Sequence, residues 1–208
     1  MTAPLPALAD DGPAARVASR PWLGGAVLRA LLALPVAAVG VAVVLGMDRF
    51  RYGEAHLTAW TLEHVLRRPA SVPSPEAVFY YQAHRSPVPV WGGFTITEEC
   101  SAAWFVGGVL VATALLLVVW RRARAGRLLV AGLVTVVLLV AVNTARMAGI
   151  TEATVHWGET GFGWSHTVGG SILMIATLCL CALLFARIAL LPRGARAGAT
   201  PPREADRP

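Results

Sequence analysis

Four long apolar segments dominate this chain of 208 residues and limit what it can fold into. They cover residues 23–47, 101–120, 128–150 and 167–191. A helix that crosses the hydrocarbon core of a bilayer needs roughly 20 apolar residues, and each segment is about that long. Hydrophobic residues make up 56% of the chain, and its mean hydropathy is +0.60. We therefore expect an all-α integral membrane protein with about four transmembrane helices in one membrane domain, residues 23–191.

The distribution of charge predicts the orientation of these helices. Both termini and the loop at 121–127 fall on one side of the predicted membrane, with twelve of the eighteen arginines and four acidic residues. The other side holds six arginines and eight acidic residues. Positively charged segments stay in the cytoplasm, so both termini should be cytoplasmic. The net charge of +6 then reflects topology, with the lipid bilayer rather than nucleic acid as the partner.

The remaining segments are shorter and polar. Residues 1–22 and 192–208 are predicted to be cytoplasmic tails, the first of them disordered, and the first apolar segment to be an uncleaved signal-anchor. Residues 48–100 should form an extracytoplasmic loop domain between the first and second spans. Its first half, 54–68, has a roughly helical apolar spacing that suits a helix on the membrane surface or on the bundle. Residues 88–97 indicate an extended segment or a short hairpin.

Three residues that are rare in or beside lipid lie at the ends of three different spans. Cys100 precedes the second span, Arg146 lies about one turn before the end of the third, and His166 directly precedes the fourth. Because the chain crosses, returns and crosses again, all three should lie at the extracytoplasmic face. An ionisable residue in such a place is a functional-site hypothesis by default.

Each of the three residues also has a simpler interpretation. Cys100 could only mark a helix start, although a thiol at a helix N-terminus is activated by the helix dipole. Arg146 could only extend to the membrane surface, but Asn143 lies on the same helical face and favours an inward polar surface. His166 could be an interfacial anchor beside the Gly- and Trp-rich loop at 157–164, in which His156 is a rival.

Taken together, the three side chains can perform acyl transfer. A thiolate attacks a carbonyl, an imidazole moves the proton to the leaving group, and a guanidinium stabilises the oxyanion. Cys179 and Cys181 lie inside the last span, so a disulfide to Cys100 is not expected. The histidines lack the spacing of metal ligands and no phosphate-binding loop is present, so neither a metal nor another cofactor is expected.

The sequence resembles the exosortase/archaeosortase family of membrane transpeptidases over residues 88–182. The resemblance rests on Thr97-Glu98-Glu99-Cys100-Ser101, on Asn143-Thr144-Ala145-Arg146, and on His166 with the glycine pair that follows it. It implies catalytic roles for Cys100, Arg146 and His166, with Asn143 and Glu99 in support. Two features depart from the family pattern: Ala102 stands where glycine is usual, and full-length members often have more spans.

The resemblance also implies a function. A membrane cysteine peptidase of this kind cleaves C-terminal sorting signals of exported proteins through a thioester on Cys100. Such PEP-CTERM-like signals combine a short motif, a membrane span and a basic tail, and the enzyme works in the bacterial cytoplasmic membrane. The alternatives are a non-catalytic membrane scaffold or assembly factor of the cell envelope and, less favoured, a thiol-redox membrane protein.

Overall fold

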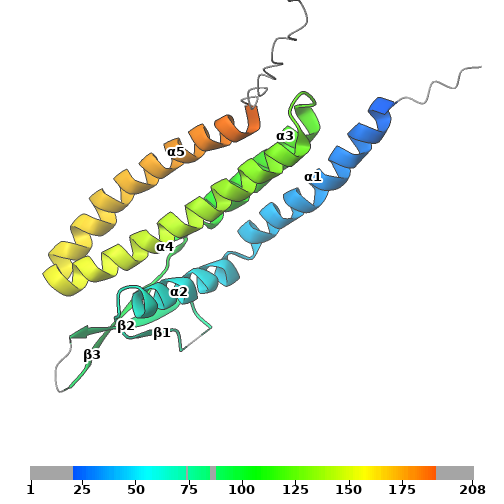
Figure 1. The fold of residues 1–208 in the computed structure, drawn as a ribbon. Helices are drawn as coiled ribbons and strands as arrows, with labels where there is room; N and C mark the ends of the chain where they lie inside the picture. The colour runs from blue at the N-terminus through cyan, green and yellow to red at the C-terminus, as the bar shows by residue number, and fades with distance from the viewer. Residues whose placement is uncertain (1–20, 74, 85–87, 191–208) are drawn as a thin grey trace, which may run out of the picture.

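The computed structural model describes residues 21–73, 75–84 and 88–190, and it is mostly helical (Figure 1). Most of the two predicted tails lies outside the described residues. Four helices run alongside one another, and a shorter helix with a small sheet lies at one end of them. The long helices are α1 (Pro21–Leu45), α3 (Ala103–Val119), α4 (Ala125–Gly163) and α5 (Gly170–Leu190).

Small residues allow α1 and α3 to approach closely. A side chain on Gly107 would come within 2.9 Å of the Gly40 carbonyl oxygen, and one on Gly40 within 2.9 Å of Leu110 Cβ. Such contacts between small residues are typical of helices that associate within a bilayer, where burial from water cannot drive packing. At the other end of α1, Arg29 donates hydrogen bonds to the carbonyls of Trp120 and Ala123 in the α3–α4 turn.

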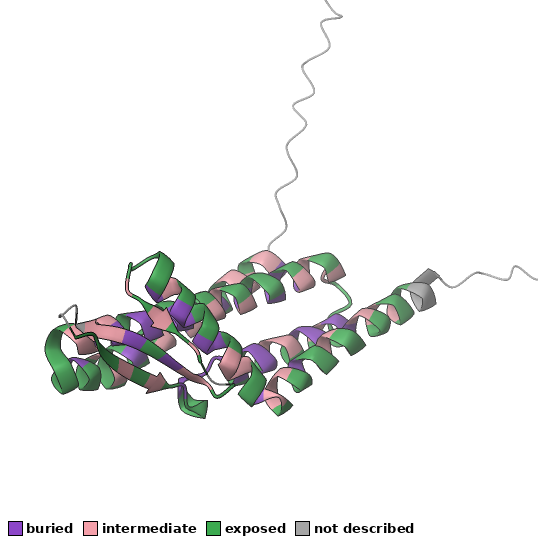
Figure 2. Cartoon of the chain, turned by 90° about the horizontal axis from the view of Figure 1, so that it is seen from below, coloured by how far each residue is buried: buried purple, intermediate pink, exposed green. Residues whose placement is uncertain are grey.

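The outer faces of the long helices are unusually apolar. Buried residues line the surfaces where the helices meet, whereas the outward faces are largely exposed (Figure 2). Large aliphatic side chains are more than half exposed on both flanking helices, including Leu31 and Leu34 on α1 and Ile172 and Leu183 on α5. A soluble protein would seldom leave so much apolar surface in water. These faces suit contact with lipid.

Two helical stretches are long and apolar enough to cross a membrane, by length and composition. They are Gly25–Leu45 and Ala125–Ala189, and the second includes both α4 and α5, which fold back on each other (Figure 1). Helix α3 is apolar but has only 17 residues, about 25 Å at the rise of an α-helix. The four-span arrangement therefore stays a prediction, while the apolar helices themselves are confirmed.

The segment between α1 and α3 forms a small unit against the outer end of α4. It contains α2 (Met47–His64) and the antiparallel strands β1 (Ala70–Ser71), β2 (Val78–His84) and β3 (Val90–Thr95), in the order β1-β2-β3. One face of α2 and the inward residues of β2 pack on α4 in a cluster that includes Leu62, Phe79, Ile96, Met147 and Cys100. The core therefore extends from the sheet to the thiol.

Three details differ from the sequence-based expectations. The chain is not all-α, because β2 pairs with the predicted extended segment, which becomes β3. The predicted loop at 157–164 is largely helical, interrupted at Gly158, whose φ of 62° and ψ of −144° are readily adopted only by glycine. A π-helical turn, Trp164–Gly169, then joins α4 to α5. Turns of this kind often occur at functional sites.

Candidate active site

Cys100 lies in a tight corner between the sheet and α3. Strand β3 leads into a short 3₁₀ turn, Glu98–Cys100, and α3 begins at Ala103. The Cys100 N–H donates to the Thr97 carbonyl, and the residue is only 7% exposed. The thiol therefore lies before the helix rather than in its first turn, contrary to the simple helix-start expectation.

His166 is the imidazole beside this thiol. The Cys100 sulfur is 4.0 Å from Nδ1 and 4.0 Å from Nε2 of His166. These distances are long for a hydrogen bond, as is common for catalytic pairs without a bound substrate. The π-helical turn at 164–169 presents the ring, so two elements 66 residues apart in the chain meet at the site.

A stack of aromatic rings holds the imidazole. The Phe162 ring lies 5.0 Å from the His166 ring with an interplanar angle of 9°, and Phe94 of β3 stacks on Phe162 at 5.5 Å. Tyr81 of β2 stacks in turn on Phe94 at 5.3 Å. Such offset-stacked pairs stabilise a specific ring orientation. The sheet thereby fixes the plane of His166 through Phe162, a residue that the sequence pattern did not identify.

Arg146 approaches the same corner from α4. Its Nη1 donates to the Cys100 carbonyl at 3.5 Å and to Asn143 Oδ1 at 3.3 Å. Its Nε is buried and has no hydrogen-bond partner within the described residues. A buried donor is rarely left unpaired. The guanidinium thus contacts the cysteine backbone through Nη1, while its Nε lies toward Gly170 of α5.

Asn143 joins the cysteine corner to a carboxylate that the sequence did not reveal. Its Nδ2 donates to the Cys100 carbonyl at 3.0 Å and to Glu54 Oε1 at 2.8 Å. Glu54 also accepts the Ala102 N–H at 3.0 Å and, at Oε2, the Ser101 hydroxyl at 2.6 Å. The only signal in the sequence is an acid on the face of α2 that also carries the buried residues Thr58 and Leu62.

Comparison with known protein families identifies the family of this chain. The family model for transmembrane exosortase (Exosortase_EpsH) matches residues 14–183, most of the chain. The chain belongs to the transmembrane exosortase family. No curated protein and no solved structure matches it. The resemblance seen in the sequence motifs is thereby confirmed at the level of the family.

Two further sequence candidates lie apart from the corner around Cys100. Glu99 is exposed, and its pKa is lowered by hydrogen bonds from its own backbone N–H and from the Thr97 side chain. His156 is exposed near the end of α4, where its Nδ1 lies 2.8 Å from the Glu152 carbonyl oxygen. The structure thus brings together Cys100, His166, Arg146 and Asn143.

The electrostatics of this candidate site favour a neutral imidazole at His166. His166 lies in the turn before the last apolar segment, and its pKa is lowered by burial and then by the positive charge of Arg146. A neutral imidazole can accept the proton of a thiol. Within the described ranges, no cluster of three His, Cys, Asp or Glu side chains is placed to hold a metal ion. What the arrangement offers is acid–base and covalent chemistry at sulfur.

Proposed function

We propose that this exosortase is a membrane cysteine peptidase and transpeptidase that removes C-terminal sorting signals from exported proteins. The observation that carries the proposal is the position of the Cys100 sulfur, 4.0 Å from both imidazole nitrogens of His166. Arg146 donates a hydrogen bond to the Cys100 carbonyl in the same corner. A thiol, a base and a cationic donor within one corner are the components of acyl transfer.

The first half of the reaction forms a thioester. The imidazole of His166 takes the thiol proton as the Cys100 sulfur attacks the scissile carbonyl, and a tetrahedral oxyanion forms. The guanidinium of Arg146, whose Nη1 lies at the Cys100 carbonyl, supplies the positive charge that stabilises that oxyanion. When the C–N bond breaks, the imidazolium returns its proton to the leaving amine. The signal peptide departs, and the exported protein stays bound to sulfur as a thioester.

The second half of the reaction releases the exported protein. Water or an amine attacks the thioester carbonyl, and His166 removes the proton of the attacking group. As the C–S bond breaks, that proton returns to the sulfur and restores the Cys100 thiol. Water gives a free carboxylate, whereas an amine gives a new amide. The same residues therefore serve both a peptidase and a transpeptidase outcome.

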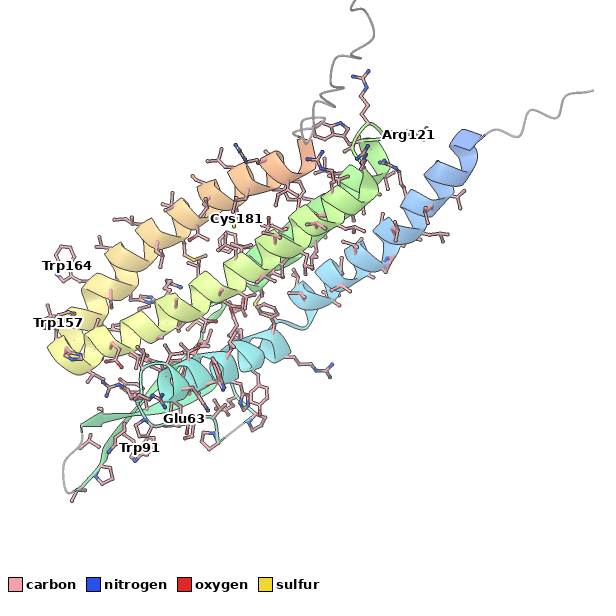
Figure 3. The ribbon with its side chains drawn as sticks, viewed as in Figure 1. Glu63, Trp91, Arg121, Trp157, Trp164 and Cys181 are labelled. Carbon is pink, nitrogen blue, oxygen red and sulfur yellow. The ribbon has the colours of Figure 1, made fainter. Side chains whose placement is uncertain are left out.

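The charge of the two ends supports an extracytoplasmic site in a multi-pass cytoplasmic membrane protein. Arg121, in the basic turn between α3 and α4, lies at one end of the long helices, and Trp157 and Trp164 lie at the other (Figure 3). Arginine-rich loops stay in the cytoplasm, and tryptophans gather at membrane interfaces. On this orientation the corner around Cys100 faces the compartment into which substrates are exported.

The test is co-expression of the chain with a candidate substrate, which ends in a short motif, an apolar span and a basic tail. Wild type should shorten the substrate by the length of the signal, and Cys100→Ala should leave it intact at equal abundance. Processing that continues in the Cys100→Ala strain would refute the peptidase function. Trapping with hydroxylamine adds a second readout, because it cleaves thioesters and should release the shortened substrate as a hydroxamate.

A further inference from the structure

Glu54 is the only Asp, Glu, Lys or Arg side chain among the buried residues of the described part of the chain. It is 4% exposed and lies on α2, 46 positions before the cysteine. Removing a carboxylate from water is costly unless hydrogen bonds replace those lost. The hydrogen-bond partners of Glu54 must therefore account for the stability of a carboxylate at this buried position.

All of its partners act as donors. Oε1 accepts the Ala102 N–H and the Asn143 amide, and Oε2 accepts the Ser101 hydroxyl. The Ser101 oxygen in turn accepts the Ala103 N–H at 3.1 Å. The first N–H groups of α3 are therefore bound by Glu54 and Ser101, so the positive end of this helix faces the carboxylate rather than the Cys100 sulfur.

The carboxylate also determines which way the Asn143 amide faces. One end of that amide meets two acceptors, Glu54 Oε1 and the Cys100 carbonyl, so it must be the NH₂ group. The other end meets Arg146 Nη1, which can only donate, so it must be the oxygen. Reversing the amide would set donor against donor at Arg146 and acceptor against acceptor at the other two partners.

We propose that Glu54 is a positioning residue for the cysteine chemistry, acting through Asn143 on Arg146 and through the start of α3 on Cys100. This inference rests on the proposed function, since it assigns Glu54 a role in the same reaction. The carboxylate and the guanidinium form a separated ion pair with the Asn143 amide between them. Opposite charges attract strongly at low dielectric, so the pair keeps Arg146 at the cysteine corner.

An amide in place of the carboxylate changes this network. Glutamine accepts hydrogen bonds at one oxygen only: with its NH₂ group toward the Asn143 amide two donors would meet, and with its NH₂ group toward Ser101 the hydroxyl would have to accept instead of donating. The residue would also lose the negative charge that balances Arg146. Glu54→Asp keeps the charge but is one methylene shorter, so it separates the contribution of charge from that of geometry.

The experiment compares three variants on α2: Glu54→Gln, Glu54→Asp and, as the matched control, Glu63→Gln. Glu63 is exposed on the same helix, so the control makes the same chemical change outside the site (Figure 3). Two quantities are measured on purified, folded protein with Cys179 and Cys181 replaced by alanine. They are the rate of substrate processing per molecule, and the rate of Cys100 alkylation by a soluble maleimide between pH 5 and pH 9.

Glu54→Gln should lower the processing rate by about tenfold or more. It should also shift the alkylation profile to lower pH, because removing a negative charge near the sulfur favours the thiolate. Glu54→Asp should keep the alkylation profile of wild type with a smaller loss of processing, and Glu63→Gln should match wild type in both measurements. A purely structural role would change the yield of folded protein but neither of these quantities.

The proposal is overturned if folded Glu54→Gln processes substrate at the wild-type rate. It is also overturned if its alkylation profile coincides with that of Glu63→Gln. The alkylation assay needs no substrate, so it tests the placement of Glu54 even if the sorting function is wrong. Failure of the sorting function would instead appear as equal processing by wild type and Cys100→Ala.

Discussion

Gly170 packs so closely against Arg146 that any side chain at position 170 would clash with the guanidinium. A Cβ atom built on Gly170 would be 2.6 Å from Arg146 Nε and 3.2 Å from Nη2. The adjacent Gly169 is different, since the nearest atom to its Cβ would be the Trp164 carbonyl oxygen at 3.7 Å, an ordinary contact. The first residue of α5 therefore provides the space in which the arginine lies beside the cysteine corner.

This difference gives a matched pair of substitutions. Gly170→Ala should displace the guanidinium and lower processing on the order of 10²-fold, the usual cost of losing one oxyanion donor. Gly169→Ala should stay near wild type, because its methyl group meets open space or ordinary contacts. Processing rate and membrane abundance are measured for both. Equal rates for the two variants would mean that the site does not depend on where Arg146 lies.

The base is tested by comparing two histidines. His166→Ala removes the imidazole beside the sulfur and should lower processing by about 10²–10⁴-fold, the typical contribution of general acid–base catalysis. His156→Ala removes an exposed ring that contacts Glu152 and should process substrate at close to the wild-type rate. An inactive His156→Ala beside an active His166→Ala would move the base to the end of α4.

The geometry of Arg146 predicts that its charge alone is not enough. Arg146→Lys keeps the positive charge, but its one ammonium must reach both acceptors of Nη1 from a different side-chain shape, and it loses Nε and Nη2, which lie toward Gly170. We expect a loss of about tenfold or more in processing, with abundance measured alongside by immunoblot. A fully active Arg146→Lys would reduce the arginine to an anchor at the membrane surface.

Apolar length and charge were enough to predict the helices, the order of the site residues and their common end of the bundle. Cys100, Arg146 and His166 each stand beside a boundary between apolar and polar sequence, where an ionisable residue is conspicuous. The family resemblance then linked them to one chemistry. At α3 and α5 the helix bounds differ from the predicted spans by a few residues, whereas α4 continues thirteen residues past the predicted end at 150, to Gly163.

The parts that could not be predicted depend on contacts between distant segments. In the sequence, Glu54 is one of several polar residues on a helix of mixed character. Only the packing of α2 on α4 brings it into hydrogen-bond contact with Asn143. Strand β2 was missed because its pairing with β3 is a tertiary choice that local propensity does not determine. In the sequence, Phe162 belongs to a segment that suggests an interfacial aromatic loop. In the structure, the π-helical turn brings His166 onto the Phe162 ring.

An ion pair attaches the outer unit to α4. Arg68 donates to both oxygens of Glu152, at 2.5 and 2.8 Å, and a further nitrogen donates to the Gln82 carbonyl at 2.7 Å. Glu152 lies beyond the predicted span at 128–150, and its pKa is lowered, chiefly by the hydrogen bond from Arg68. The helix that carries Asn143 and Arg146 is thereby joined to β2.

The sign of this shift predicts a pH dependence of stability. A carboxyl with a lowered folded pKa stabilises the fold above its ordinary value, 4.5, and that contribution is lost as the pH falls through the folded pKa. Glu152→Gln should therefore lower the unfolding free energy by about 1 kcal/mol at pH 7, since the pair is partly exposed. The deficit should shrink below pH 4. Thermal unfolding in detergent at both pH values measures it, and a constant deficit would contradict the ion-pair explanation.

The membrane orientation is tested by two single-cysteine proteins, each with the three native cysteines replaced by alanine. Arg121→Cys and Trp157→Cys probe exposed positions at opposite ends of the long helices (Figure 3). In intact cells a membrane-impermeant maleimide should label Trp157→Cys and leave Arg121→Cys unlabelled until the cells are permeabilised. The loop at 121–127 keeps three of its arginines in the first variant, so its cytoplasmic preference should persist. The reverse labelling pattern would place Cys100 on the cytoplasmic side, where a nucleophile could not meet an exported substrate.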